Sequence, residues 1–227
     1  MSKQAVIIYG PPGSGKGTQA ELLARKYNFI HFDSGRYIES LVHDKALQKN
    51  PIIRRERKNF DTGILCTPTW VLKIVTEATA RIAKAGYGIV YSGSLRTMFE
   101  SFGDKKNKGL LLNLVKFYGR KNIRVLALKV RPASSLKRNS SRRVCSVCGM
   151  PMLAKFTHRE CDFCEGLLRK RTLDTPSVIK VRLKQYADRT YPIIARMKKN
   201  GFRVIEINGE PAPYKIHALI VKKLGLE

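Results

Sequence analysis

The sequence has few acidic residues and no long hydrophobic run. Its 227 residues include 44 Lys and Arg against 17 Asp and Glu, which gives a formal net charge of +27 at pH 7. Apolar runs such as Val6–Tyr9 are far shorter than the roughly 20 residues that a membrane-spanning helix needs. No long apolar stretch precedes a small-residue cleavage site near the N-terminus. We therefore expect a cytoplasmic protein that does not associate with a membrane.

Cysteine is also scarce, and its distribution argues against a secreted disulfide framework. Four of the five cysteines fall between positions 145 and 164, a bunching that is more typical of a metal site. Hydrophobic residues make up 43% of the chain, enough for a sizeable core and too many for a disordered basic tail. The length predicts one ordinary domain with small insertions, and we expect a monomer.

The positive charge is spread over several segments of the chain and does not form one long basic tail. Such an excess favours anionic partners, including nucleotides, RNA and membrane surfaces. A basic face that is merely solvated explains the same composition equally well. Composition alone therefore leaves a nonspecific contact with RNA open.

A phosphate-binding motif begins at Gly10, directly after the apolar, strand-like segment 5–9. The residues Gly-Pro-Pro-Gly-Ser-Gly-Lys-Gly-Thr (10–18) fit G-x-x-x-x-G-K-[ST] except for one extra glycine before the threonine. A helix-forming segment follows, so the loop would present backbone N–H groups and a helix N-terminus to phosphate oxygens. Lys16 would reach the β- and γ-phosphates, and Thr18 would address the phosphates or Mg²⁺. The predicted phosphate-binding residues are Gly13, Ser14, Gly15, Lys16, Gly17 and Thr18.

The rest of the chain alternates predicted strands with predicted helices. We expect strands at 29–33, 89–91, 123–130 and 202–207, and helices after Pro68 and at 109–118, 176–199 and 211–224. Pro192 is expected to bend the longest helix. This alternation predicts an α/β protein whose parallel sheet is covered by helices on both faces. Ligands of such sheets bind at the carboxyl ends of the strands, where the glycine-rich loop lies.

The four bunched cysteines form two Cys-x-x-Cys pairs, at Cys145 and Cys148 and at Cys161 and Cys164. Two such knuckles can place four thiolates around a structural, tetrahedral Zn²⁺, and the metal would stabilise an insertion that has little core of its own. Disulfides and a nucleic-acid-binding ribbon are the competing interpretations. The remaining cysteine, Cys66, is expected to be a small buried hydrophobe.

Five arginines stand at the ends of predicted elements, and each taken singly is typical of a protein surface. Taken together they look like a clamp, because phosphoryl transfer needs positive groups around the developing charge and Arg grips phosphate oxygens with two donors. They are Arg96, Arg138, Arg142, Arg171 and Arg182.

The form of the glycine-rich loop resembles that of the adenylate kinase family of nucleoside monophosphate kinases, and the resemblance can be followed over nearly the whole chain. It implies a P-loop nucleoside monophosphate kinase fold, with a five-stranded parallel core, a monophosphate-binding insertion and a closing, zinc-binding lid. The implied core comprises 1–33, 67–138 and 176–227, the insertion 34–66, and the lid 139–175.

The resemblance also implies roles for individual residues. Ser34-Gly35 resembles the start of the monophosphate-binding insertion, Asp61-x-Gly63-x-Leu65 its end, and the segment 92–97 the family's Asp-Gly-Phe-Pro-Arg-Thr. The implied ATP-binding residues outside the loop are Arg138, Arg142 and Pro211. The implied monophosphate-binding residues are Ser34, Glu39, Ile64, Leu65, Cys66, Gly93, Arg96, Glu100, Arg171 and Arg182. The implied catalytic residues are Lys16, Arg96, Arg142, Arg171 and Arg182, with Mg²⁺ accompanying ATP.

Four positions depart from the family pattern. Arg36 and Ser92 stand where the family has acids that orient waters around Mg²⁺. Glu39 replaces an arginine of the acceptor phosphate, and Glu100 replaces the glutamine that reads adenine. An ionised carboxylate accepts hydrogen bonds but donates none, so Glu100 suits guanine's N–H pair better than adenine's mixed edge.

The resemblance implies an enzyme that moves the γ-phosphoryl group of Mg-ATP to a nucleoside monophosphate, with AMP as the expected acceptor. Two alternatives stay open. The first is a kinase for another monophosphate such as GMP, and Glu100 is the residue that suggests it. The second is a nucleotide-dependent RNA- or ribosome-binding protein with weak kinase activity, for which the charge of +27 and the cysteine knuckles are the motive.

Overall fold

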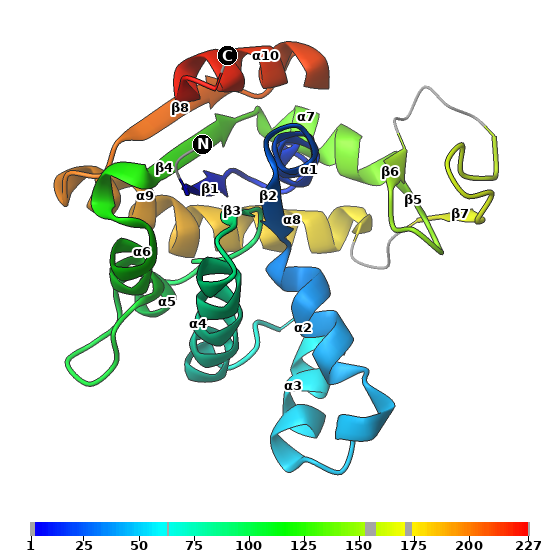
Figure 1. Ribbon diagram of the computed structural model, residues 1–227. Helices are drawn as coiled ribbons and strands as arrows, with labels where there is room; N and C mark the ends of the chain where they lie inside the picture. Colours follow the sequence, from blue (N-terminus) through cyan, green and yellow to red (C-terminus); the bar gives the residue numbers. More distant parts are fainter. Residues whose placement is uncertain (1–2, 63, 153–157, 171–173, 227) are drawn as a thin grey trace.

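The computed structural model of the chain describes residues 3–62, 64–152, 158–170 and 174–226. Its centre is a five-stranded, fully parallel sheet in the order β2-β3-β1-β4-β8 (Figure 1). The strands are β1 (Ala5–Tyr9), β2 (Phe29–Phe32), β3 (Gly88–Tyr91), β4 (Ile123–Lys129) and β8 (Val204–Asn208). The parallel five-stranded sheet predicted for this chain is therefore confirmed.

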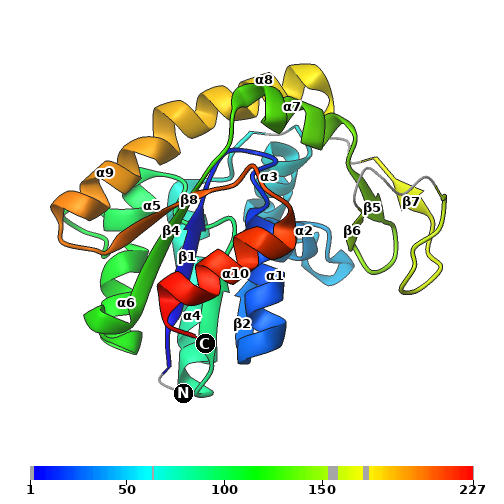
Figure 2. The same cartoon turned by 90° about the horizontal axis from the view of Figure 1, so that it is seen from above.

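Alternate residues of β1 supply two separate hydrophobic cores, one on each face of the sheet. Val6 and Ile8 pack with α1 (Lys16–Tyr27) and α10 (Pro213–Leu224). The other side chains of the strand face a larger core built from α4 (Pro68–Lys84), α5 (Met98–Phe102), α6 (Leu110–Tyr118) and α9 (Tyr191–Lys199). Figure 2 shows α1 and α10 side by side on one face. A central strand buried on both faces reads as a continuous apolar run, as the sequence of β1 does.

A helical excursion separates β2 from α4. It consists of α2 (Ser34–Val42), the 3₁₀ turn η1 (Lys45–Leu47) and α3 (Pro51–Asp61), and it projects away from the sheet in Figure 1. The Asp33 side chain caps α2, and the Asn50 side chain caps α3 ahead of a proline at its first position. The buried Glu56 carboxylate accepts hydrogen bonds from the backbone N–H and the hydroxyl of Thr67, which fixes α3 to the start of α4.

A second excursion carries the four clustered cysteines. After β4, α7 (Pro132–Ser140) leads into a small three-stranded antiparallel sheet in the order β6-β5-β7. Its strands are β5 (Arg143–Cys145), β6 (Pro151–Met152) and β7 (Leu168–Arg169). Figure 1 shows this sheet well apart from the parallel one.

The long predicted helix 176–199 is interrupted by a π-helical segment. The chain runs through α8 (Pro176–Gln185), the π-helical η4 (Tyr186–Thr190) and α9. Pro192, the residue expected to bend the helix, lies in the first turn of α9, where its missing N–H costs least. The last helix begins at Pro213, two residues later than predicted. No helix among the described residues is both long and apolar enough to cross a membrane.

Candidate active site

The glycine-rich loop joins the carboxyl end of β1 to the first turn of α1. Gly13 and Gly15 have φ values of 75° and 88°, a region that favours glycine. A Cβ at Gly13 would lie 2.5 Å from Nδ2 of Asn139, whereas no described atom lies within 4 Å of a Cβ placed at Gly15 or Gly17. The loop is therefore packed underneath and open above, which suits the close approach of phosphate oxygens to its backbone N–H groups. Ser14 is fully buried in the loop, and Thr18 lies half-buried in the first turn of α1.

Lys16 is the electrostatic centre of this region. Its Nζ donates hydrogen bonds to the carbonyl oxygens of Gly10 (2.7 Å) and Pro11 (2.9 Å). Burial, together with the nearby charges of Arg96, Arg182 and Arg142, lowers the pKa of Lys16 to about 7. These four cations come from four separate parts of the sequence. Such a concentration of positive charge fits a polyanion such as a nucleotide's phosphate chain.

A buried carboxylate, Asp174, holds two of these arginines in place. Its side chain is only 2% exposed. Nε and Nη2 of Arg142 donate to its two oxygens at 2.9 and 2.7 Å, and Nη1 of Arg182 donates to Oδ1 at 3.4 Å. The sequence analysis did not single out Asp174, although it is the sole acid in residues 166–187. Its position as a lone acid in a basic segment could have identified it as a partner of the arginines.

A second group of polar atoms surrounds Gly93, just beyond the end of β3. A Cβ at Gly93 would lie 3.0 Å from Oγ of Ser34, 3.2 Å from Nη2 of Arg96 and 3.8 Å from Oδ1 of Asp33. The guanidinium of Arg96 is oriented by its Nε, which donates to the Gly93 carbonyl oxygen at 2.7 Å. The start of α2 and the loop after β3 thus meet at one point, at the carboxyl edge of the sheet.

The other predicted acceptor-site residues differ in their surroundings. Glu100 is buried, and its Oε2 accepts a hydrogen bond from the backbone N–H of Arg96 at 2.9 Å. Burial raises the pKa of the Glu100 carboxyl. Ile64 and Glu39 are exposed and Leu65 is half-buried. Cys66 is buried, as expected, and burial raises the pKa of its thiol to about 12.

Arg138 connects the glycine-rich loop to the loop that follows β8. Its Nη1 donates to the carbonyl oxygens of Gly209 (2.7 Å) and Gly13 (3.5 Å), and its Nη2 donates to that of Glu210 (2.7 Å). Pro211, the next residue, is exposed. Arg171, the remaining predicted arginine, lies outside the described residues.

The sulfur atoms of Cys145, Cys148, Cys161 and Cys164 all lie within 4.8 Å of one another. Sγ of Cys145 lies 3.5 Å from that of Cys164, and Sγ of Cys148 lies 3.7 Å from that of Cys161. Disulfide sulfurs would be about 2.05 Å apart, whereas thiolates bound at about 2.3 Å to one tetrahedral Zn²⁺ lie about 3.8 Å apart. The cluster therefore fits zinc and excludes disulfides among these four residues.

The turns of the two knuckles differ in the residue that has a positive φ. Gly149 has a φ of 67° after the first knuckle, but after the second it is Glu165 that has a positive φ, of 56°. Gly166 is needed for a different reason, because a Cβ there would lie 2.7 Å from Sγ of Cys145.

Known proteins resemble this chain over its whole length. A family model described as an AAA domain matches residues 9–108. An adenylate kinase from Clostridium botulinum (strain Loch Maree / Type A3) is 31% identical, with 97% of this chain and 98% of that protein aligned. An adenylate kinase from Chlamydia pneumoniae is 31% identical over 86% of each chain, and one from Caldicellulosiruptor bescii is 27% identical over 98% of this chain and 99% of its own.

This chain belongs to the adenylate kinase family. It is therefore a nucleotide-binding phosphotransferase of the nucleoside monophosphate kinase class, built on a P-loop fold that carries a tetracysteine cluster. The sequence-based assignment to this family is confirmed.

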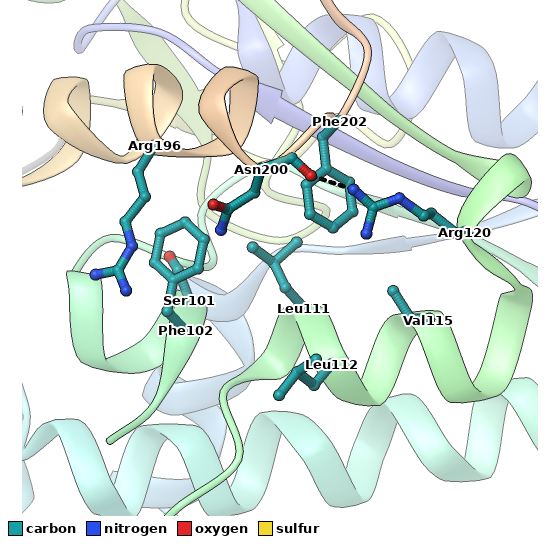
Figure 3. Close-up of a pocket in the computed structure, with 9 residues that line it drawn as sticks. All are labelled: Ser101, Phe102, Leu111, Leu112, Val115, Arg120, Arg196, Asn200 and Phe202. Carbon is teal, nitrogen blue, oxygen red and sulfur yellow. Dashed lines mark hydrogen bonds between the residues drawn. The ribbon is translucent and has the colours of Figure 1, made fainter. Parts of the chain in front are cut away.

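One cavity of this adenylate kinase family member lies away from the glycine-rich loop. It has a volume of about 440 Å³ and opens between α6 and the end of α9 (Figure 3). Its two arginines are held by aromatic stacking, Arg196 over Phe102 and Arg120 over Phe202, with guanidinium carbons 4.4 and 4.6 Å from the ring centroids.

Proposed function

We propose that the protein transfers the γ-phosphoryl group of Mg-ATP to AMP and so forms two molecules of ADP. The observation that carries this proposal is the convergence of Lys16 with Arg96, Arg142 and Arg182 at the mouth of the glycine-rich loop. The alignment with adenylate kinases over nearly the full chain supports the same reaction.

The proposed chemistry relies on positioning and on charge. The transition state of phosphoryl transfer spreads negative charge over the equatorial oxygens of the transferred group, and pre-oriented cations stabilise it without reorganisation. Lys16 and the arginines would supply those cations. A general base is unnecessary, because the acceptor phosphate is already an anion. The arginine predicted at position 171 would join this set.

Each implied domain would have its own role in binding the two nucleotides. The core (1–33, 67–138 and 176–227) would hold ATP on the loop 13–18, with Arg138, Arg142 and Pro211 around it. The insertion 34–66 would hold the monophosphate together with Gly93 and Arg96, and the lid 139–175 would close over both nucleotides. Closure would exclude water from the transferring group. Zn²⁺ on the four cysteines would be structural.

The loss of Lys16 tests this proposal. Lys16→Ala should lower the rate of ADP formation from Mg-ATP and AMP by about 10²–10³-fold or more, because one pre-oriented donor of transition-state charge is removed. Its melting temperature should not fall, since the lysine is buried at a cost to its charged form. Lys26→Ala, on the exposed end of the same helix, is the matched control. Turnover of Lys16→Ala near that of the parent would refute the assignment.

A GMP-specific kinase is the second candidate, and Glu100 is the observation that favours it. An ionised carboxylate suits guanine, whereas a protonated one offers a donor and an acceptor, as glutamine does. Because burial raises the pKa of Glu100, protonation would favour AMP as the pH falls. Glu100→Gln should therefore raise the relative use of AMP at neutral and alkaline pH and flatten its pH dependence. Unchanged acceptor preference at every pH would remove Glu100 from the acceptor site.

A further inference from the structure

The Mg²⁺ that accompanies ATP needs a carboxylate of the protein, and in this chain that carboxylate has to come from a position other than the two that the family resemblance implies. Proteins usually bind nucleotide-associated Mg²⁺ through one or two carboxylates together with the phosphates and water. Position 36 is an arginine and position 92 is a serine. Oγ of Ser92 is held by Nε2 of His31 at 2.8 Å. The two positions at which the family resemblance implies acids therefore carry none.

Most carboxylates around the glycine-rich loop are already engaged by cations or backbone donors. The two oxygens of Glu21 contact Arg25 and His31 at 2.8 and 2.9 Å. Both oxygens of Asp174 accept hydrogen bonds from Arg142, and Glu100 is buried against a backbone N–H. Both oxygens of Glu21 and of Asp174 are thus occupied, and the Glu100 carboxyl is largely shielded from solvent by burial.

Asp33 is different from each of them. Its Oδ1 caps α2 by accepting hydrogen bonds from Gly35 N (3.0 Å) and Arg36 N (3.4 Å). Its Oδ2 has no hydrogen-bond partner among the residues that the structure describes, and the side chain is 35% exposed. Asp33 is also the carboxylate whose charge acts on Lys16, and its Oδ1 shares the space around Gly93 with Arg96.

Arg36 forms only a long ion pair with this carboxylate. Its Nε lies 4.0 Å from Oδ2 of Asp33, while its Nη2 donates to the carbonyl oxygen of Gly149 in the first zinc knuckle at 2.6 Å. The guanidinium is thus directed to the lid. One oxygen of Asp33 stays available at the carboxyl end of β2, beside Lys16.

We propose that Asp33 is the positioning carboxylate for the Mg²⁺ that accompanies ATP, and that it replaces the two acids this chain lacks. Its cap fixes one oxygen, and the other would be left to accept hydrogen bonds from waters of the cation. The inference rests on the proposed function in that ATP is the donor. Asp33 would not contact the base of the acceptor monophosphate.

The test compares ATP binding with and without Mg²⁺, measured by calorimetry in Mg²⁺ and in EDTA. Asp33→Asn keeps the cap, because Asn caps helices as well as Asp does, and removes only the charge. Without Mg²⁺ the variant should bind ATP more tightly than the parent, since a repelling carboxylate is gone. With Mg²⁺ it should bind more weakly. The ratio of the two dissociation constants should change by about tenfold or more, as for other outer-shell partners of metals.

Two further variants make the result specific. Asp44→Asn, the same change at the cap of η1, should leave the ratio at the parental value. Adding Ser92→Asp to Asp33→Asn should restore the ratio, because it returns a carboxylate to the end of the neighbouring strand. A ratio for Asp33→Asn equal to that of the parent would overturn the proposal. A parent that binds no ATP would overturn the proposed function as well, so the two failures can be told apart.

Discussion

At the scale of single residues, burial among cations makes Lys16 a proton-linked group, although the charge of Asp33 opposes the shift of its pKa. Burial and three neighbouring arginines lower its pKa to about 7 from the ordinary 10.5. Bound phosphates would favour the charged amine and raise this pKa again. Binding of the phosphates by Lys16 would therefore be accompanied by protonation of this residue, which can be measured.

Mg-ATP binding at pH 8 should consequently take up protons, approaching one per site. In the free protein Lys16 is mostly neutral at this pH, and the uptake should fade as the pH drops below 7. Calorimetry in buffers of different ionisation enthalpy measures the uptake directly. Lys16→Ala should abolish it, and Lys26→Ala should keep it. Equal heats in all buffers for the parent at pH 8 would contradict this account.

The same shift fixes the sign of a pH effect on stability. Between pH 7 and pH 10.5 the unfolded chain binds a proton at Lys16 that the folded chain does not. The free energy of unfolding contributed by this group therefore rises with pH across that window. Below pH 7 both states are protonated and the contribution stays constant.

Sequence reasoning succeeded at residues whose signal is local. The glycine-rich loop and Lys16 are contiguous, and the cysteine knuckles have a fixed spacing, so their chemistry could be predicted. It failed for Glu56 and Asp174, which act through partners contributed by other elements. Glu56 meets Thr67 eleven positions away, and Asp174 meets Arg142 thirty-two positions away. Only the fold brings such pairs together.

At the scale of elements, the strand and helix positions followed from hydrophobic periodicity and from proline and glycine placement. β1 and α4 match the prediction because an apolar run and a proline at a first helical position are strong signals. The π-helical segment η4 was missed. The sequence shows that Pro192 disturbs the helix. It does not show that a π-helical segment forms just before the proline, at Tyr186–Thr190.

The zinc knuckles should determine whether the small antiparallel sheet folds. In the described part of the segment 139–175, the buried apolar residues are Cys145, Met152 and Cys161, which is very little core. Metal binding would therefore supply most of the stability of this sheet. Chelation with demonstrated zinc loss should lower the melting temperature, and Cys148→Ser should prevent stoichiometric zinc binding.

Cys66→Ala is the matched control for the zinc experiment. Cys66 lies at the end of the helical excursion and contacts Glu56, away from the cluster. This variant should retain one zinc ion per chain and the response to chelation. An unchanged melt of the parent after verified metal loss would argue against a structural role for zinc.

At the scale of the whole molecule, a hydrogen bond between described residues joins the two excursions. Nη2 of Arg36, at the start of α2, donates to the carbonyl oxygen of Gly149 in the first knuckle. A Cβ at Gly149 would lie 2.8 Å from that nitrogen, so the approach is close. The contact joins the helical excursion to the sheet that carries the four cysteines.

Arg36→Ala should shift the nucleotide-free protein toward more open arrangements. Loss of about 1 kcal/mol from such a bond corresponds to roughly a fivefold change in population. Small-angle X-ray scattering should show a larger radius of gyration for the variant without nucleotides and the parental value with ATP and AMP. Arg54→Ala, an exposed arginine on α3, is the control. Equal radii for Arg36→Ala and the parent without nucleotides would show that the contact does not hold the site closed.

The most direct test of the central claim is a competition among acceptors. The parent protein is given Mg-ATP and equal concentrations of AMP, GMP, CMP and UMP in one mixture, and the initial consumption of each monophosphate is quantified by chromatography, because ATP yields ADP in every turnover whichever acceptor is used. The ratio of the initial consumption rates reports the relative kcat/KM values. Our account predicts that AMP is consumed far faster than the other monophosphates. Faster consumption of GMP, or no consumption of any monophosphate by folded and zinc-loaded protein, would contradict it.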